Sequence, residues 1–184
     1  MKYVVLILIL ALCATSAFGF DGVRKGFVLG GGLGFGYASV SMDNAPGVES
    51  LTNAGGAVNF LIGYAWDEQN MLVFLRDGVI YSEETVWGGS LTLAQGFSGV
   101  GYFHYFGPLG KSFFMTGGLG LQDWTPLESG YEANDYGFGI LAGGGYEFTR
   151  HVQVYGSLSF GKTSDIFADY THFQFQLGVS AVAF

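Results

Sequence analysis

Ser159, His172 and Asp169 are the residue types of a catalytic triad, and they lie within fourteen positions of one another. A serine hydroxyl becomes a nucleophile when a histidine accepts its proton and a carboxylate orients that histidine. If the segments around Asp165 and Ile166 form a symmetric hairpin, Ser159 and His172 face each other across it. No hydrolase motif surrounds them, and serine is common on any polar strand face. We therefore expect an interior hydrogen-bond network and no enzymatic activity.

Two other patterns that could carry chemistry lack the context that each needs. Residues 137–142 have the spacing of a dinucleotide-binding fingerprint, but no strand–helix–strand unit surrounds them. His104, His151 and His172 are scattered and share no metal-ligand spacing. The sequence therefore predicts no cofactor and no metal centre.

Arg76 and Glu147 are the opposite charges that residue alternation places on inner faces of the predicted strands. An unpaired charge in a low-dielectric interior is expensive, so we expect these two side chains to pair, directly or through water. The neighbouring Asp77 is expected near a rim or a bulge. The pair is interpreted as a structural plug, with a gate or selectivity element as the alternative.

The elements that position these residues are strands, since apolar and small or polar residues nearly alternate in eight stretches. In residues 152–160, Val152, Val154, Leu158 and Phe160 fall on one face, whereas the intervening residues are mostly polar. The predicted strands run approximately over residues 26–41, 55–66, 71–81, 88–106, 112–123, 136–148, 152–162 and 171–184.

Composition indicates that the apolar face of these strands meets lipid. Charged residues are 12% of the 184 positions, against about 25% in soluble domains. No stretch approaches the ~20 apolar residues of a membrane helix, which suits a barrel that exposes every second residue to lipid. A soluble barrel such as a lipocalin would need a charged exterior that these strands lack. The glycine-rich inner face would enclose either a plugged lumen, which we favour, or a thin passage.

The N-terminus has the organisation of a secretory signal peptide. A basic start at Lys2 precedes an apolar stretch over residues 4–12, and Ala17 and Gly19 are the small residues of a cleavage site. Cleavage after Gly19 would leave residues 20–184 as the barrel domain. Cys13 offers lipidation as an alternative, although Leu12 stands where that motif requires a small residue.

At this point the chain resembles the small eight-stranded outer-membrane barrels, such as the OmpA membrane domain and OmpX. The resemblance implies an all-β, antiparallel, up-and-down transmembrane barrel with short periplasmic turns, longer outer loops and both termini in the periplasm. It also implies that a terminal aromatic, here Phe184 with Val182, is recognised by the barrel-assembly machinery. Phe173, Phe175 and Leu177 occupy the other parity, so we expect a late bulge or an imperfect signal.

Acidic residues gather in the segments predicted to form the outer loops. They are Asp43, Glu49, Glu83, Glu84, Asp123, Glu128, Glu132, Asp135, Asp165 and Asp169. With fifteen acidic and seven basic residues, the chain carries a formal charge of −8, which disfavours nucleic acid as a partner. The acidic rim would attract cations or basic partners, and divalent cations could bridge it to lipopolysaccharide.

The sequence therefore predicts an integral outer-membrane barrel with a structural or interaction role, in contact with membrane lipids. A narrow channel for small or apolar solutes is the alternative, and a lipid-modifying hydrolase is a third. Since no segment follows Phe184, we expect none of the peptidoglycan binding of longer relatives.

Replacing the terminal aromatic tests the predicted assembly signal. We expect Phe184→Ala to lower the yield of folded barrel in outer membranes, because the assembly machinery would lose the side chain that it recognises. The measurement is the folded fraction in isolated membranes, and a yield equal to that of the wild type would refute the signal.

Overall fold

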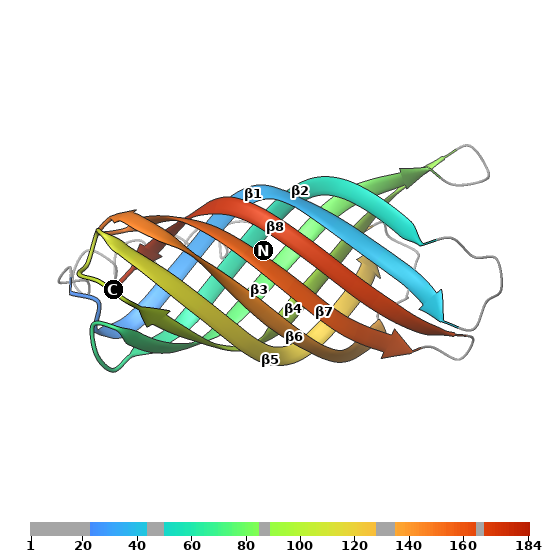
Figure 1. The fold of residues 1–184 in the computed structure, drawn as a ribbon. Coiled ribbons are helices and arrows are strands. Elements are labelled where there is room, and N and C mark those ends of the chain that lie inside the picture. The colour runs from blue at the N-terminus through green and yellow to red at the C-terminus, as the bar shows by residue number, and fades with distance from the viewer. Residues whose placement is uncertain (1–22, 44–49, 85–88, 128–134, 165–167) are drawn as a thin grey trace, which may run out of the picture.

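The structure is a computed structural model that describes residues 23–43, 50–84, 89–127, 135–164 and 168–184. They form eight antiparallel strands that close into a barrel (Figure 1), with β8 paired to β1. The strands are β1 (Gly26–Asp43), β2 (Leu51–Ala65), β3 (Asn70–Glu84), β4 (Ser90–Tyr105), β5 (Ser112–Pro126), β6 (Asp135–Thr149), β7 (Val152–Ser164) and β8 (Asp169–Ala183). All eight predicted strands are confirmed. The predicted signal peptide, with Cys13, lies outside the described residues.

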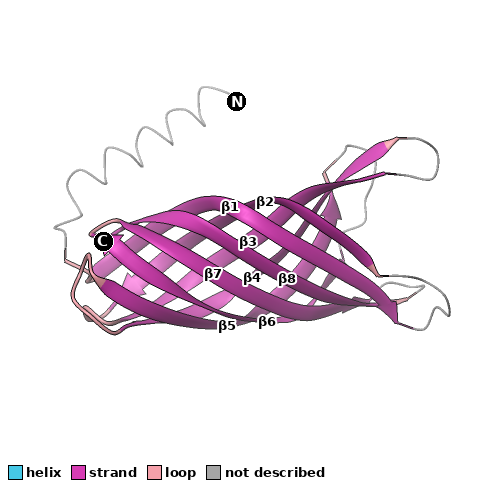
Figure 2. Cartoon of the chain, turned by 45° about the horizontal axis from the view of Figure 1, so that its top comes forward, coloured by secondary structure: helices cyan, strands magenta, loops and turns pink. Residues whose placement is uncertain are grey.

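The strands are tilted because their pairing is staggered around the barrel. Following paired residues once around the sheet from Gly30 leads back to β1 at Val40, ten residues further along. In an eight-stranded barrel such a stagger gives a strand tilt of roughly 40° and an interior that side chains can fill. The tilt is visible in Figure 1 and Figure 2.

The two ends of the barrel differ. The connections after β2, β4 and β6 are short turns, and we call this the turn end; the other four connections, after β1, β3, β5 and β7, mark the loop end. The C-terminal end of β8 lies at the turn end (Figure 1 and Figure 2). At that end the side-chain amide of Asn70 and the backbone amide of Gln69 both donate to the Asp67 carboxylate, which lowers its pKa below the ordinary value.

The outer face of the barrel is apolar, as the alternation of the sequence predicts. Phe35 is the most exposed of its large side chains, at 83%. Aromatic residues gather toward both ends of this face, with Tyr64 and Phe113 near the turn end and Tyr136 near the loop end. Such an apolar band with aromatic borders is the surface that a membrane barrel presents to lipid. Among the described residues, no helix is long and apolar enough to cross a membrane.

In β3 the inner and outer faces are the reverse of the prediction. Phe74, expected inside, is half exposed on the outer face, whereas Leu75 and Asp77 are buried inside. Met71, Val73 and Leu75 pack in the lumen cluster, whereas Leu72 lies on the outer face with Phe74. Arg76 consequently points outward.

The lumen is packed with side chains in two clusters. The larger cluster fills the turn-end half and draws residues from every strand, together with Phe184. The smaller one lies nearer the loop end and contains Ala38, Ala57, Val79, Tyr81 and Leu93. Side chains from all eight strands therefore pack together in the turn-end half of the lumen.

Several glycines allow close approach between strands of this narrow barrel. A Cβ atom at Gly34 of β1 would lie 2.2 Å from the carbonyl oxygen of Leu177 and 2.6 Å from the Cα atom of Gly178. A Cβ atom at Gly56 of β2, by contrast, would meet nothing within 4 Å.

These two glycines form a matched test of interior crowding. We expect Gly34→Ala to lower the free energy of unfolding by about 1–3 kcal/mol, because the β1–β8 pairing must shift to admit the methyl group. Gly56→Ala should leave it unchanged or raise it by about 0.5 kcal/mol, since alanine restricts the unfolded chain. Urea unfolding of both variants in lipid vesicles measures the difference, and equal losses would contradict the assignment.

Candidate functional site

A buried ion pair between Arg24 and Glu147 closes the turn end of the lumen. Both residues are 1% exposed, and Arg24 donates through Nη2 to Glu147 Oε2. The backbone N–H of Gly110 donates to the same carboxylate oxygen at 2.6 Å. Arg24 Nη1 also donates to the carbonyl oxygen of Glu68 at 2.5 Å, so both side chains are held by the turns as well as by each other.

Aromatic rings complete this closure. The Arg24 guanidinium lies 3.7 Å from the centre of the Tyr105 ring, which is a cation–π contact. Tyr105 in turn packs against Phe114 and donates its hydroxyl to Gln153 Oε1 at 3.0 Å. We call Arg24, Glu147, Tyr105 and Phe114 the turn-end plug.

The predicted pairing of Arg76 with Glu147 is wrong, because the two side chains lie on opposite sides of the barrel wall. Arg76 points outward from β3 and donates to both carboxylate oxygens of Asp123 on β5. It also donates to the Ser98 hydroxyl at 2.8 Å. An arginine facing lipid at the membrane midplane costs roughly 2–4 kcal/mol, and these partners neutralise and satisfy it.

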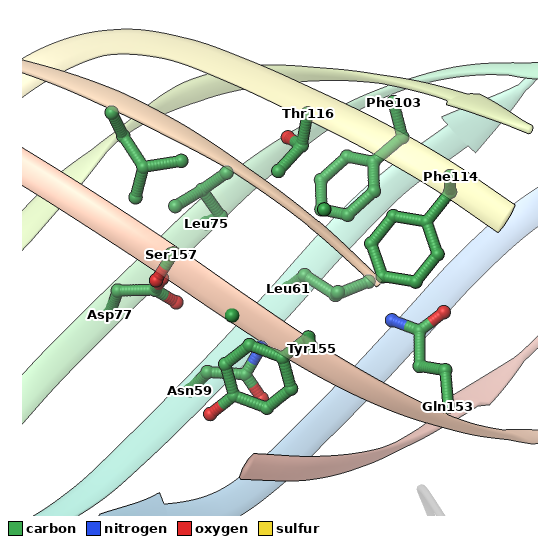
Figure 3. A pocket seen from close by; sticks show the side chains of 13 residues that line it. Asn59, Leu61, Leu75, Asp77, Phe103, Phe114, Thr116, Gln153, Tyr155 and Ser157 are labelled. Carbon is green, nitrogen blue, oxygen red and sulfur yellow. The ribbon is translucent and has the colours of Figure 1, made fainter. Parts of the chain in front are cut away.

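Asp77 is inside the lumen rather than at a rim or bulge, and it is 5% exposed. The Ser157 hydroxyl of β7 donates to its Oδ2 atom at 2.7 Å across the barrel, as Figure 3 shows. The two residues line a lumen cavity of about 20 Å³ together with Asn59, Tyr155 and Thr116. This cavity, which apolar residues also line, is the candidate binding site of the structure.

The predicted triad is not assembled. The β7–β8 register places Ser159 opposite Gln174 and His172 opposite Gly161, two residues away from the symmetric hairpin that we expected. His172 Nε2 lies 2.8 Å from the Thr163 hydroxyl, and Asp169 accepts a hydrogen bond from Ser164 at 2.5 Å.

The inner face toward the loop end is lined by uncharged polar side chains. Gln95, Gln122, Gln174, Gln176 and His172 are each at most 1% exposed. Gln95 Nε2 donates to the Phe173 carbonyl oxygen at 2.9 Å, which connects β4 with β8 across the lumen. The predicted interior hydrogen-bond network around Ser159 and His172 is wrong, because the Ser159 hydroxyl and His172 Nδ1 have no hydrogen-bond partner and His172 Nε2 contacts Thr163 instead.

The acidic rim is described only in part. Asp43, Glu84 and Asp135 stand at strand ends at the loop end, and Glu83 accepts a hydrogen bond from Asn53. Glu49, Glu128, Glu132 and Asp165 lie outside the described residues. Asp123 does not belong to the rim, since it pairs with Arg76 on the outer wall. Within the described ranges, no group of three or more His, Cys, Asp and Glu residues could hold a metal ion.

Phe184 and Val182 point into the barrel and are 1% and 2% exposed. The β7–β8 and β1–β8 ladders run without a register shift, so the late bulge that would turn these residues outward is not formed. The Phe184 ring stacks on His151 at 6.5 Å, beside the turn-end plug. Phe173, Phe175 and Leu177 make the lipid-facing set of β8 instead.

Sequence reasoning overlooked Arg24 and misplaced Asp77. Arg24 precedes β1, so the alternation of strand residues could not assign it to the inner or the outer face. A cation directly before a barrel strand is nevertheless a candidate for an ion pair in the lumen. Asp77 was placed on the wrong face because the inner and outer faces of β3 were assigned in reverse. Arg76 and Asp77 are adjacent, so one of the two must point inward. Both faces of β3 carry large apolar residues, so the sequence alone does not decide which of the two charges points inward.

Closed topology, an apolar outer band and a packed lumen define the fold of a small eight-stranded outer-membrane β-barrel, as the resemblance predicted. No family model matches the sequence, and no curated protein matches it.

Solved structures share the fold at low sequence identity. Ail, the attachment invasion locus protein of Yersinia pestis, solved in complex with the heparin analogue sucrose octasulfate, superposes with a TM-score of 0.59. It is 12% identical, and the match covers 86% of this chain and 99% of Ail. Neisserial surface protein A superposes with a TM-score of 0.56 at 13% identity, covering 89% of this chain and 98% of that protein.

The buried ion pair predicts a strong effect of a single truncation. Glu147→Ala should lower the free energy of unfolding by about 3–5 kcal/mol, because Arg24 would remain buried without its counter-charge. Asp169→Ala, at an exposed position of the loop end, should change it by less than about 0.5 kcal/mol. Equilibrium unfolding in detergent micelles measures both variants, and a small loss for Glu147→Ala would show that Arg24 reaches water.

Proposed function

We propose that the chain is an integral outer-membrane protein without enzymatic activity, with a closed lumen and a structural or interaction role. Its turn end and both termini would lie in the periplasm, and its loop end would face outward. The observation that carries the proposal is the turn-end plug, where Arg24 and Glu147 are buried by the aromatic rings and turns around them.

The plug disfavours steady transport through the lumen. Opening a passage would require separation of the Arg24–Glu147 pair and of the rings of Tyr105 and Phe114 that pack together. Each separated charge would then need water or another partner, at a cost of several kcal/mol. A narrow channel therefore needs a rearrangement of the turn end, and this supports the closed barrel over the transport alternative.

A hydrolytic role is disfavoured by the positions of its candidate residues. Ser159 is 3% exposed, and its hydroxyl oxygen has no hydrogen-bond partner, whereas His172 lies opposite Gly161. Without a histidine in contact, the serine has no base to activate it.

The chemistry of an external partner follows from the acidic residues of the loop segments. Ail was solved with a polyanion. The loop segments of this chain carry nine acidic residues, namely Asp43, Glu49, Glu83, Glu84, Glu128, Glu132, Asp135, Asp165 and Asp169. Such a rim would repel a polyanion and favour a basic protein surface, or divalent cations that bridge it to lipopolysaccharide.

Single-channel recording tests the closed lumen. We expect refolded wild-type protein in planar bilayers to show no steady discrete openings, because side chains fill the turn end. The triple variant Tyr105→Ala/Phe114→Ala/Glu147→Ala serves as a control for sensitivity, since removal of both rings and of the ion pair should admit ions. Discrete openings of the wild type, with folding verified in the same preparation, would favour the channel instead.

A further inference from the structure

The lumen cavity is lined by polar and apolar side chains. Asn59, Asp77, Tyr155 and Ser157 lie on one side of it (Figure 3). Around the rest lie Leu61, Leu75, Phe103, Phe114 and Leu141, together with the polar Thr116 and Gln153. A volume of about 20 Å³ accommodates one water-sized particle and excludes organic solutes.

Asp77 brings an uncompensated carboxylate to this cavity. The ion pairs among the described residues are Arg24–Glu147 and Arg76–Asp123, and Asp77 takes part in neither. Arg76, its neighbour in sequence, directs its guanidinium to the outer wall. The Ser157 hydroxyl donates to Asp77, and the Gln176 side chain also interacts with it, but both are neutral. An ionised Asp77 would therefore be balanced by a cation in the cavity, whereas a protonated Asp77 would need none.

Neutral oxygen atoms without partners surround the same space. Asn59 Oδ1, Thr116 Oγ1 and the Tyr155 hydroxyl are buried, and none has a hydrogen-bond partner. Asn59 is paired with Asp77 in the β2–β3 ladder, so their side chains start from adjacent positions on one face. Tyr155, 5% exposed, lies close enough to Asp77 for an electrostatic interaction.

We propose that this cavity binds a single monovalent cation of the size of Na⁺, with Asp77 supplying the charge and Asn59, Tyr155 and Ser157 supplying neutral oxygen ligands. Hard cations prefer oxygen ligands, and the residues around Asp77 offer carboxylate, amide and hydroxyl oxygens. One carboxylate balances one positive charge. A divalent ion would leave an excess charge in a half-apolar cavity, and the described residues contain no cluster of three His, Cys, Asp and Glu side chains.

Occupation of the site would link three strands. Asp77 belongs to β3, Asn59 to β2, and Tyr155 and Ser157 to β7. β7 is not a sheet neighbour of β2 or β3, so the cation would connect opposite sides of the barrel. Binding only to the folded state makes stability depend on the cation concentration in a saturable manner.

Thermal unfolding of the refolded protein at pH 8 tests the site, with NaCl exchanged for choline chloride at constant ionic strength. Choline is too large for the cavity. We expect the wild-type midpoint to rise by about 3–5 °C with Na⁺ and to saturate. Asp77→Asn should abolish the difference, and in choline it should be at least as stable as the wild type because it buries no charge. The control Asp169→Asn should keep the full response.

Tyr155→Phe provides a second variant that preserves the charge and most of the volume. It should retain the response with roughly tenfold weaker apparent affinity. Direct binding is measured by ²³Na resonance broadening, which should appear for the wild type and disappear for Asp77→Asn. Equal midpoints of the wild type in both salts, or a Na⁺ response that survives in Asp77→Asn, would overturn the proposal.

Discussion

Closure of the sheet determines both the width of this barrel and the kinds of side chain on its two faces. A strand that spans a membrane must satisfy its backbone hydrogen-bonding groups within the protein, and only a sheet without edges does so for every strand. The pairing of β8 with β1 supplies that closure. With eight strands and a ten-residue stagger, closure also fixes a narrow interior, and the side-chain types on each face follow from that geometry.

Charged side chains on the inner and the outer face of the barrel are each paired with an opposite charge. Inside, Glu147 receives hydrogen bonds from Arg24 and from a turn amide. Outside, Arg76 uses Asp123 and Ser98 of the two following strands. In both cases the partner comes from a segment distant in the sequence, so each ion pair connects parts of the barrel that strand pairing alone does not join. Asp77 is the exception, and for that reason it is the residue from which a ligand is inferred.

The number of strands, their approximate bounds and most lipid-facing sets were predictable from the sequence, because period-two alternation is a local property. Side-chain pairing across the lumen was not. Glu147 binds Arg24, which lies 123 positions away and outside any strand. The predicted contact between Ser159 and His172 is not formed, because the β7–β8 register differs by two residues from the expected one. Ser159 therefore lies opposite Gln174. In β3, Arg76 and Asp77 are adjacent, so one of them must point into the lumen. Which one does so depends on the partners that the closed barrel brings to each face.

The pairing of β8 with β1 has a consequence for how the molecule is made. Leu29 pairs with Ala183, so the contacts that close the barrel join positions near opposite ends of the described chain. Contacts between residues so far apart in the sequence form late and slowly, because the chain loses conformational entropy before the contacts contribute favourable energy. Until they form, β1 and β8 each present an unpaired edge that can recruit a strand of another molecule. The time between the synthesis of β1 and its pairing with β8 is therefore the interval in which this chain is most exposed to aggregation.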